Sequence, residues 1–270
     1  MRRNKALLGA SVLAWLGAAG AGSPLHAAII ASDNADNAAY APQPNHGWMA
    51  VNGGSGYNLW TGLTDTAGGG TYMEGVGVNG RQTDGNFSFA LFAGGGTFDV
   101  SRPLAASVTS GEFTIETRFD LAGAGPNLVN LRIGNTTTSF GAGELLSFGI
   151  VNNNQLSYTD STGLHTLPSG EARGSVWDWT IDFDAAAGTY SGSVANAGGG
   201  FSGTFSGNLD ASGTSVGSFA VINSSTGGNQ NLIFDQPTFS TPVPEPTSLG
   251  LLTIAVSAIG VGTRRPRRRE

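Results

Sequence analysis

The chain has 270 residues, of which 43 are Gly, and only 12% of its residues are charged. So much Gly and so little charge argue against a helix-rich enzyme with a surface covered by Lys and Glu. The sequence contains no Cys, which excludes disulfide frameworks, thiolate zinc sites, Cys nucleophiles and iron–sulfur clusters. The composition therefore indicates turn-rich β structure.

The N-terminus has the three parts of a secretory signal. Basic residues at 2–5 precede an apolar run at 6–21, and the sequence then reaches Ala27 and Ala28. This order of basic, apolar and small-residue parts is typical of a signal peptide. A retained membrane anchor is the alternative, but the apolar run is shorter than the ~20 residues of a spanning helix. We therefore expect residues 1–27 to be removed on export, with cleavage after Ala27 or Ala28.

The C-terminus carries a second three-part segment. It begins with Val243, Pro244, Glu245 and Pro246, continues with an uncharged stretch at 247–263, and ends with a basic cluster. A stretch of this length can span a thin bilayer as an apolar helix, and the basic cluster then stays on the cytoplasmic side. Proline on both sides of Glu245 keeps the backbone extended, in a form that a processing protease can bind. The basic cluster consists of Arg264, Arg265, Arg267, Arg268 and Arg269.

This tail resembles the PEP-CTERM sorting signal, which an exosortase recognises in exopolysaccharide-producing bacteria with two membranes. The resemblance covers residues 243–270 and includes all three parts in the required order. It implies that signal peptidase and exosortase act on the chain, that the inner membrane holds it transiently, and that it ends at the cell surface or outside the cell. An ordinary tail anchor with a proline-rich approach is the alternative.

The part of the chain between these ends is strongly acidic. The leader contributes +3 and the C-terminal cluster +4, so residues 28–246 carry a formal charge of −13. Five Arg oppose 18 carboxylates in this part, and Lys is absent. Such a surface repels nucleic acid and anionic lipid, whereas neutral glycans and divalent cations are compatible partners. We therefore exclude nucleic acid as a partner.

Two segments alternate between apolar and polar residues, as half-buried strands do. Residues 112–121 and 176–184 each place four apolar side chains on one face and mostly charged ones on the other. The apolar face of the first segment is formed by Phe113, Ile115, Phe119 and Leu121, and that of the second by Trp177, Trp179, Ile181 and Phe183.

Further strands are predicted between clusters of turn residues. About ten strands and no helical pattern favour one all-β domain at residues 28–242. We expect a two-sheet antiparallel β-sandwich of the jelly-roll type. The additional strands are predicted at residues 86–92, 127–133, 145–151, 155–159, 189–194, 200–206, 216–222 and 231–239.

The domain also resembles a group of secreted bacterial proteins that are similar in layout to concanavalin-like and laminin-G-like sandwiches. The resemblance spans most of residues 33–240, and it implies this fold without an activity. It is carried by Asp33-Asn34-Ala35, Tyr40, Gly47-Trp48, the stretch from Asn52 to Tyr57, Trp60, the strand at 86–93, Arg102 and the closing strand at 231–235.

Residues for catalysis are sparse. His46 and His165 lie in turn-like segments. The single Gly-x-Ser-x-Gly match, Gly213 to Gly217, runs into the strand predicted at 216–222 and not into a helix, so it does not mark a serine nucleophile elbow. The paired-carboxylate motif of sandwich glycosidases, Glu-x-Asp-x-x-Glu, is also missing. Asp182 and Asp184 share one strand face, either as a weak acid pair or as a solvent-facing surface. We therefore expect no enzyme.

Aromatic residues between 45 and 60 are candidates for glycan binding. Trp48, Tyr57 and Trp60 lie among Asn and Gly, and aromatic faces can stack on sugars while amides bond their hydroxyl groups. The alternative is that the two Trp side chains fill the sandwich core.

A structural calcium site is the second binding hypothesis. Asp33, Asp36 and Asp235 lie near the two ends of the domain, which jelly rolls often bring together, and calcium prefers carboxylate and carbonyl oxygens. The alternative is that these side chains cap turns and pair with amides. No other cofactor is expected.

These observations lead to one preferred function and two rivals. The preferred function is that of an exported, non-catalytic protein, structural or adhesive in an exopolysaccharide matrix or biofilm. The first rival is a carbohydrate-binding module that uses Trp48, Tyr57 and Trp60, and the second is a glycan hydrolase without a recognisable motif.

Overall fold

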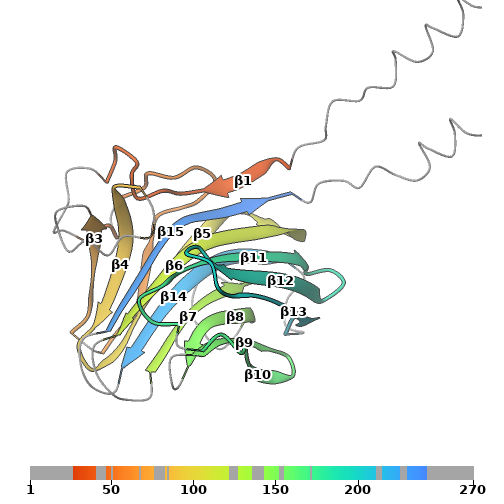
Figure 1. Ribbon diagram of the computed structural model, residues 1–270. Coiled ribbons are helices and arrows are strands. Elements are labelled where there is room, and N and C mark those ends of the chain that lie inside the picture. Colours follow the sequence, from red (N-terminus) through yellow and green to blue (C-terminus); the bar gives the residue numbers. More distant parts are fainter. Residues whose placement is uncertain are drawn as a thin grey trace, which may run out of the picture. The chain divides into compact units, whose positions relative to one another are not determined.

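Strands separated by short turns make up all the regular structure that the computed structural model describes (Figure 1). The described residues are 27–40, 47–49, 51–66, 68–75, 83, 85–121, 127–135, 143–151, 155–170, 172–210, 215–225 and 230–241. Within these ranges the chain forms strands β1 (Ile29–Ser32), β2 (Thr61–Asp65), β3 (Gly70–Gly75), β4 (Phe87–Ala93), β5 (Gly96–Val108), β6 (Ser110–Leu121), β7 (Asn127–Gly134), β8 (Glu144–Val151), β9 (Gln155–Asp160), β10 (Gly163–Thr166), β11 (Val176–Asp184), β12 (Thr189–Asn196), β13 (Ser202–Asn208), β14 (Val216–Ser225) and β15 (Gln230–Ser240).

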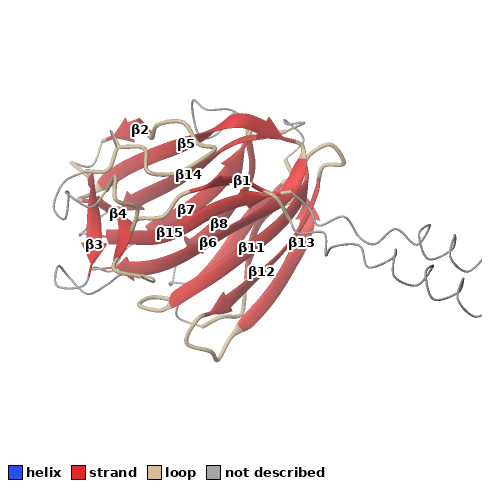
Figure 2. Cartoon of the chain, turned by 90° about the horizontal axis from the view of Figure 1, so that it is seen from above, coloured by secondary structure: helices blue, strands red, loops and turns tan. Residues whose placement is uncertain are grey.

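The strands form two antiparallel sheets that pack against each other (Figures 1 and 2). Sheet 1 has the order β13-β12-β11-β6-β15-β4-β3, and β1 also pairs with β15. Sheet 2 has the order β10-β9-β8-β7-β14-β5-β2. The chain crosses repeatedly between the sheets, for example from β5 to β6 and from β14 to β15. The predicted all-β sandwich is therefore confirmed.

The two strictly alternating segments, β6 and β11, are neighbours in sheet 1. Trp179 lies opposite Ile115, and Ile181 lies opposite Phe113. The Trp179 ring lies 5.0 Å from the ring of Phe148 in sheet 2, so these side chains join the sheets. The predicted inward residues whose side chains are described are all buried, namely Phe113, Ile115, Phe119, Trp177, Trp179, Ile181 and Phe183.

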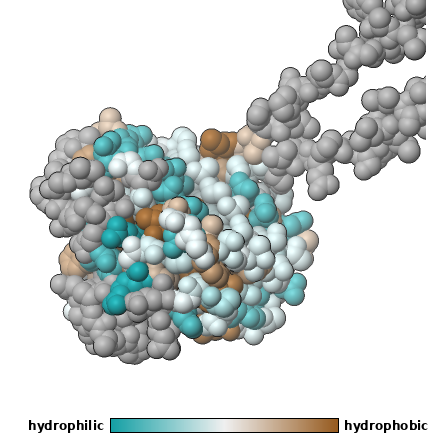
Figure 3. Space-filling model, viewed as in Figure 1, coloured by the Kyte–Doolittle hydropathy of each residue, from teal (hydrophilic) through white to brown (hydrophobic). Residues whose placement is uncertain are grey.

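All ten predicted strands are present, but five further strands were not predicted. β1, β2, β3 and β10 are four to six residues long, too short to show a period. β5 is long, yet residues 98–104 are buried without a break. Neighbours on both faces of this strand remove the alternation that marks a half-buried strand. The surface in Figure 3 shows mostly hydrophilic and near-neutral residues, with hydrophobic ones in small groups.

Pairing of β1 with β15 brings the two ends of the domain together. The N–H of Ala28 donates to Oγ1 of Thr241 at 2.9 Å, and the N–H of Thr241 donates to the carbonyl of Ala28 at 2.9 Å. Residues 1–26 of the predicted signal peptide and the whole predicted sorting segment lie outside the described residues. Among the described residues there is no helical segment with the length and hydropathy of a membrane span.

Candidate functional site

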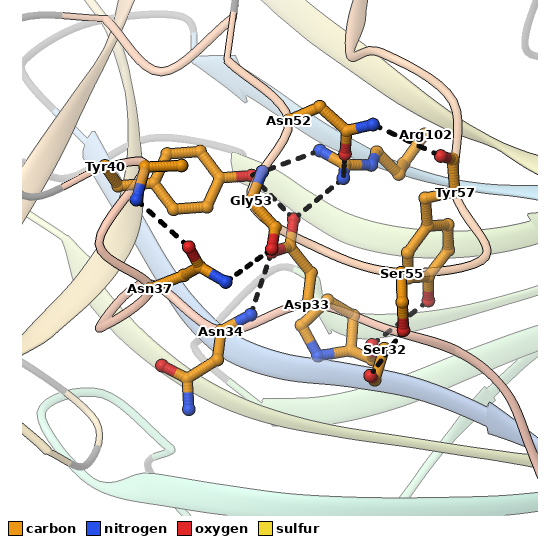
Figure 4. A network of polar contacts seen from close by, with 12 residues as sticks. Ser32, Asp33, Asn34, Asn37, Tyr40, Asn52, Gly53, Ser55, Tyr57 and Arg102 are labelled. Atoms are coloured by element: carbon orange, nitrogen blue, oxygen red, sulfur yellow. Dashed lines mark hydrogen bonds and ion pairs between the residues drawn. The ribbon is translucent and has the colours of Figure 1, made fainter.

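Two segments near the N-terminus lie side by side and form one layer (Figure 4). Ser32 and Ser55 exchange two backbone hydrogen bonds of 2.9 and 2.8 Å, and their side-chain oxygens are 3.3 Å apart. The side-chain amide of Asn37 donates across the gap to the carbonyl of Gly53. These contacts hold residues 32–37 against residues 53–55.

A buried ion pair anchors this layer to sheet 2. Nη2 of Arg102, on β5, lies 3.0 Å from Oδ2 of Asp33, and both side chains are 0% exposed. Arg102 also donates to Oδ1 of Asn52 at 2.6 Å and to the hydroxyl oxygen of Tyr40 at 3.3 Å. The Tyr40 hydroxyl donates to Oδ2 of Asp33 at 2.8 Å (Figure 4). The network therefore connects three separate parts of the chain.

Aromatic rings surround the Arg102 charge. Its guanidinium carbon lies 5.2 Å from the ring centroid of Tyr57 and 4.9 Å from that of Trp60. The faces of such rings attract a cation, and most strongly when it is removed from water. The hydroxyl of Tyr57 donates to the carbonyl of Pro237 on β15 at 3.1 Å. The residues that stabilise Arg102 thus also tie the layer to sheet 1.

Burial of the Asp33–Arg102 ion pair costs desolvation free energy. Burial raises the pKa of Asp33, and the Arg102 charge offsets part of this rise. Removing two charges from water costs several kcal/mol per ion, and apolar residues of similar volume often fold equally well. We infer that the pair serves mainly to hold the N-terminal segment in one geometry.

A polar depression of about 390 Å³ lies between this layer and β15. We call it the polar notch. Each residue of its lining carries a hydroxyl, amide or carboxylate group or is a glycine. The lining consists of Ser32, Asp33, Asn34, Asn37, Gly53, Gly54, Ser55, Gln236 and Thr238.

The walls of the polar notch depend on close backbone approaches. A Cβ on Gly54 would lie 2.5 Å from the carbonyl oxygen of Ser32, and one on Gly53 would overlap the ring of Tyr40. Gln236 has φ of 54° and sits in the bulge of β15 between Asp235 and Thr238. For a residue other than glycine this conformation costs about 1–3 kcal/mol and often marks a functional site.

The three carboxylates of the predicted calcium site serve other purposes. Asp33 pairs with Arg102, Asp36 accepts the backbone N–H groups of residues 86 and 87, and Asp235 accepts those of Ala35 and Gln236 at 2.9 and 2.8 Å. In the described part of the chain, no group of three His, Cys, Asp or Glu side chains is placed to hold a metal. The calcium prediction is therefore wrong for these residues, and the capping alternative holds.

The predicted glycan-stacking residues are also placed differently. Trp48, Tyr57 and Trp60 are only 0%, 4% and 4% exposed. The rings of Trp48 and Trp60 meet at 4.5 Å between centroids, and both contact Phe89 and Phe234. Rings enclosed in this way present no face to a sugar. The core interpretation is correct, and the stacking interpretation of these three residues is wrong.

His165 belongs to a structural cluster at the β9–β10 turn. Its Nε2 lies 3.1 Å from Oδ1 of Asp160 and 2.8 Å from Oγ1 of Thr162. In a hydrolytic triad the carboxylate and the nucleophile contact different ring nitrogens, whereas here both contact the same one. Burial acts to raise the pKa of Asp160, but hydrogen bonds from Thr162, Tyr190 and His165 lower it to about 2. The cluster therefore fixes the turn, and His46 lies outside the described residues.

Asp182 and Asp184 occupy the solvent-facing positions of β11. Asp182 lies opposite Glu112 on β6 and Ser191 on β12. Both carboxylates are exposed, which agrees with the solvent-facing alternative for this pair.

Sequence patterns identified residues around Arg102, beneath the polar notch, but missed most of the residues that line the notch. Asp33, Tyr57 and Trp60 were singled out, and all three contact or surround Arg102. Ser32 and Gln236 carry no sequence signal because the site forms only when distant segments meet. One sequence signal was available. Asn34, Asn37 and the stretch from Asn52 to Gly54 are rich in residues that favour tight turns, which indicates that these segments form loops.

Replacing Arg102 tests the anchoring role of the ion pair. Arg102→Met leaves Asp33 buried without its counter-charge, and we expect a loss of about 3–5 kcal/mol in the free energy of unfolding. Adding Asp33→Asn should recover part of this loss, with a coupling of about 0.5–3 kcal/mol. Urea unfolding measures both. Arg132→Met, which breaks the partly exposed pair with Glu144, is the matched control and should cost less.

Asp235 makes stability depend on pH. Burial, together with Glu116 and Asp36, raises its pKa to about 7, although two backbone N–H groups oppose the rise. The folded state then keeps a proton that the unfolded chain releases near pH 4, so stability falls as pH rises from about 4 to about 7. Asp235→Asn keeps the acceptor oxygen and cannot ionise. Unfolding at pH 5 and 7.5 should show a flatter dependence for this variant, and an unchanged slope would contradict the assignment. The exposed Asp182→Asn is the control.

Comparison with known proteins relates this chain to other sandwiches. No family model and no curated protein matches it. A carbohydrate esterase from the Shiga toxin-encoding bacteriophage phi24B is similar at 11% identity and a TM-score of 0.50, over 80% of this chain and 99% of that one. A Lotus tetragonolobus seed lectin has 12% identity and a TM-score of 0.43, over 70% of this chain and 100% of that one. A Ulex europaeus lectin solved with the methyl glycoside of α-L-fucose has 8% identity and a TM-score of 0.44, over 69% of this chain and 99% of that one. At such identities the likeness concerns the fold alone.

Proposed function

We propose that this chain is an exported, non-catalytic β-sandwich that binds a neutral saccharide unit in the polar notch. In this role it serves as a structural or adhesive component of an exopolysaccharide matrix. The lectins and the esterase named above handle carbohydrate by their names, but the proposal rests on the residues of the notch.

The chemistry of the notch lining carries the proposal. Its described side chains are hydroxyls and amides, except for Asp33, whose charge is balanced by Arg102. Hydroxyls and amides both donate and accept hydrogen bonds, and these are the groups that a sugar offers in return. A volume of about 390 Å³ also falls within the usual range of small-molecule sites.

The layer is rigid enough to hold a ligand in one orientation. The Ser32–Ser55 backbone bonds and the Asn37–Gly53 contact fix the two walls. The buried Arg102–Asp33 pair supports them from inside. A site whose polar groups are already positioned loses less entropy when a ligand binds.

Charge favours a neutral ligand over an anionic one. Residues 28–246 carry −13, which repels acidic polymers at a distance. The notch lining contains neither Lys nor Arg among its described residues, so nothing there attracts a carboxylate or phosphate. We therefore expect neutral rather than acidic saccharides to bind.

Export is supported by both ends of the sequence. The signal-like N-terminus and the PEP-CTERM-like tail call for processing at residues 27–28 and 243–246. Ala28, which precedes the described strand β1, and Thr241, which follows β15, are hydrogen-bonded neighbours. Trimming at either junction leaves the strands intact.

Removal of two hydroxyl groups from the notch tests saccharide binding. The double variant Ser32→Ala and Ser55→Ala keeps both backbone bonds and removes two hydrogen-bonding groups from the lining. On an array of neutral and acidic oligosaccharides, we expect the natural chain to bind neutral members. The double variant should bind about tenfold more weakly or worse, since each hydrogen bond contributes about 0.5–1.5 kcal/mol.

The control variant also removes two hydroxyl groups, but at a site outside the polar notch. Ser107→Ala with Thr109→Ala removes two exposed hydroxyl groups at the end of β5 and should leave binding unchanged. An array without signal, or equal loss in both double variants, would refute a saccharide site in the notch.

Mass spectrometry of the extracellular form tests export and processing. We expect a chain that lacks residues 1–27 and the Arg cluster at 264–269, because both ends are removed during sorting. An extracellular chain that retains the intact Arg cluster would contradict the sorting proposal, whatever the outcome for saccharide binding.

A further inference from the structure

The hairpin at one edge of sheet 1 is free of charge in an otherwise acidic domain. Residues 185–209, which contain β12 and β13, include no Asp, Glu, Lys or Arg. The domain as a whole, residues 28–246, carries −13. Two copies of so acidic a protein repel each other over most of their surface. This hairpin is a place where they can approach without that repulsion.

β13 also lacks the features that protect an exposed strand edge. Within the described residues, the sheets end in β13 and β3, and in β10 and β2. β3 contains Glu74, β2 contains Asp65, and β10 has only four residues. β13 has seven residues with no charge and no Pro, and its register with β12 shows no bulge. Charges, Pro and bulges are the usual means of preventing edge-to-edge pairing.

The hydrogen bonds of the hairpin show which backbone groups point outward. The N–H of Asn196 donates to the carbonyl of Phe201, and that of Leu209 donates to the carbonyl of Gly188. Bonded pairs alternate along an antiparallel ladder, so Gly203, Phe205 and Gly207 bond to β12. Ser202, Thr204 and Ser206 consequently direct their N–H and C=O groups away from it. No other described strand pairs with this side of β13. At its C-terminal end the carbonyl of Asn208 accepts the N–H of Ser161 from the β9–β10 turn, which leaves the outward groups of Ser202, Thr204 and Ser206 for pairing.

We propose that β13 pairs with β13 of a second copy of this chain, antiparallel and about a two-fold axis at Thr204. In this register Thr204 lies opposite its own counterpart, and Ser202 lies opposite Ser206 of the other copy. Each of these pairs exchanges two backbone hydrogen bonds. Sheet 1 then continues from one copy into the next.

The side chains at the edge are compatible with this pairing. Ser202, Thr204 and Ser206 are exposed, and Thr and Ser side chains directly opposite each other stabilise an antiparallel pair. Because the contact is isologous, it uses the same edge on both copies and stops at a dimer. Such a dimer carries two polar notches, which suits a protein that connects matrix chains.

Disulfide cross-linking tests the pairing in the full-length chain. The sequence has no Cys, so Thr204→Cys introduces a single thiol. The proposed register places the two Cα atoms about 5.5 Å apart, within the range that a disulfide bridges. Under a mild oxidant we expect a reducible dimer on non-reducing gels.

Two further measurements check position and register. Ser191→Cys, equally exposed but one strand further in on β12, lies about 14 Å or more from its counterpart and should remain monomeric. Ser202→Cys mixed with Ser206→Cys should form a heterodimer, whereas each alone should not cross-link. A Thr204→Cys chain that cross-links no more than Ser191→Cys would overturn the proposal, as would self-cross-linking of Ser202→Cys. Neither result depends on saccharide binding.

Discussion

The buried contact between Arg102 and Asp33 holds the segment that follows β1 against the sandwich. Arg102 comes from a central part of β5, and Asp33 comes from the segment that follows β1. Tyr40 and Asn52 complete the network, while Tyr57 and Trp60 cover the charge. Without this contact the two walls of the polar notch would be aligned by the Ser32–Ser55 bridge, the Asn37–Gly53 bond and the bond from the Gly53 N–H to the Tyr40 hydroxyl. We infer that the pair serves to select this orientation, because apolar residues of similar volume would give equal or greater stability.

The distribution of charge explains where the protein can meet its partners. Carboxylates far outnumber Arg in residues 28–246, and several of them occupy the outward positions of β6 and β11. Two places differ. In the polar notch the Asp33 charge is balanced from inside, and at the β12–β13 edge no charge is present. A neutral polymer and a second copy of the chain both avoid the repulsion that the rest of the surface imposes. A surface of this charge opposes non-specific association, and we assign the two proposed contacts to these places.

Residue patterns predicted the fold much better than the site. The alternation in β6 and β11 identified a core face because each side chain on a half-buried strand reports its own burial. β5 was not predicted because it is buried on both faces, and a strand of this kind does not alternate between apolar and polar residues. For the site, Trp48, Tyr57 and Trp60 were candidates for glycan binding or for the core, and they lie in the core. Asp33, Asp36 and Asp235 were candidates for calcium or for capping, and they bond to Arg102 or to backbone N–H groups. Aromatic and acidic residues look alike in sequence whether they serve packing, capping or binding.

The sequence by itself determined the all-β class, the acidity of the domain and the family resemblance of the tail, because these follow from composition, local period and short-range order. Only the tertiary structure decided that Ser32, Gly54 and Gln236 share one depression, that Arg102 lies beneath it, and that β13 is the last strand of sheet 1. These facts depend on which strands become neighbours. That choice is made by packing two whole sheets together, and no local stretch of residues contains it.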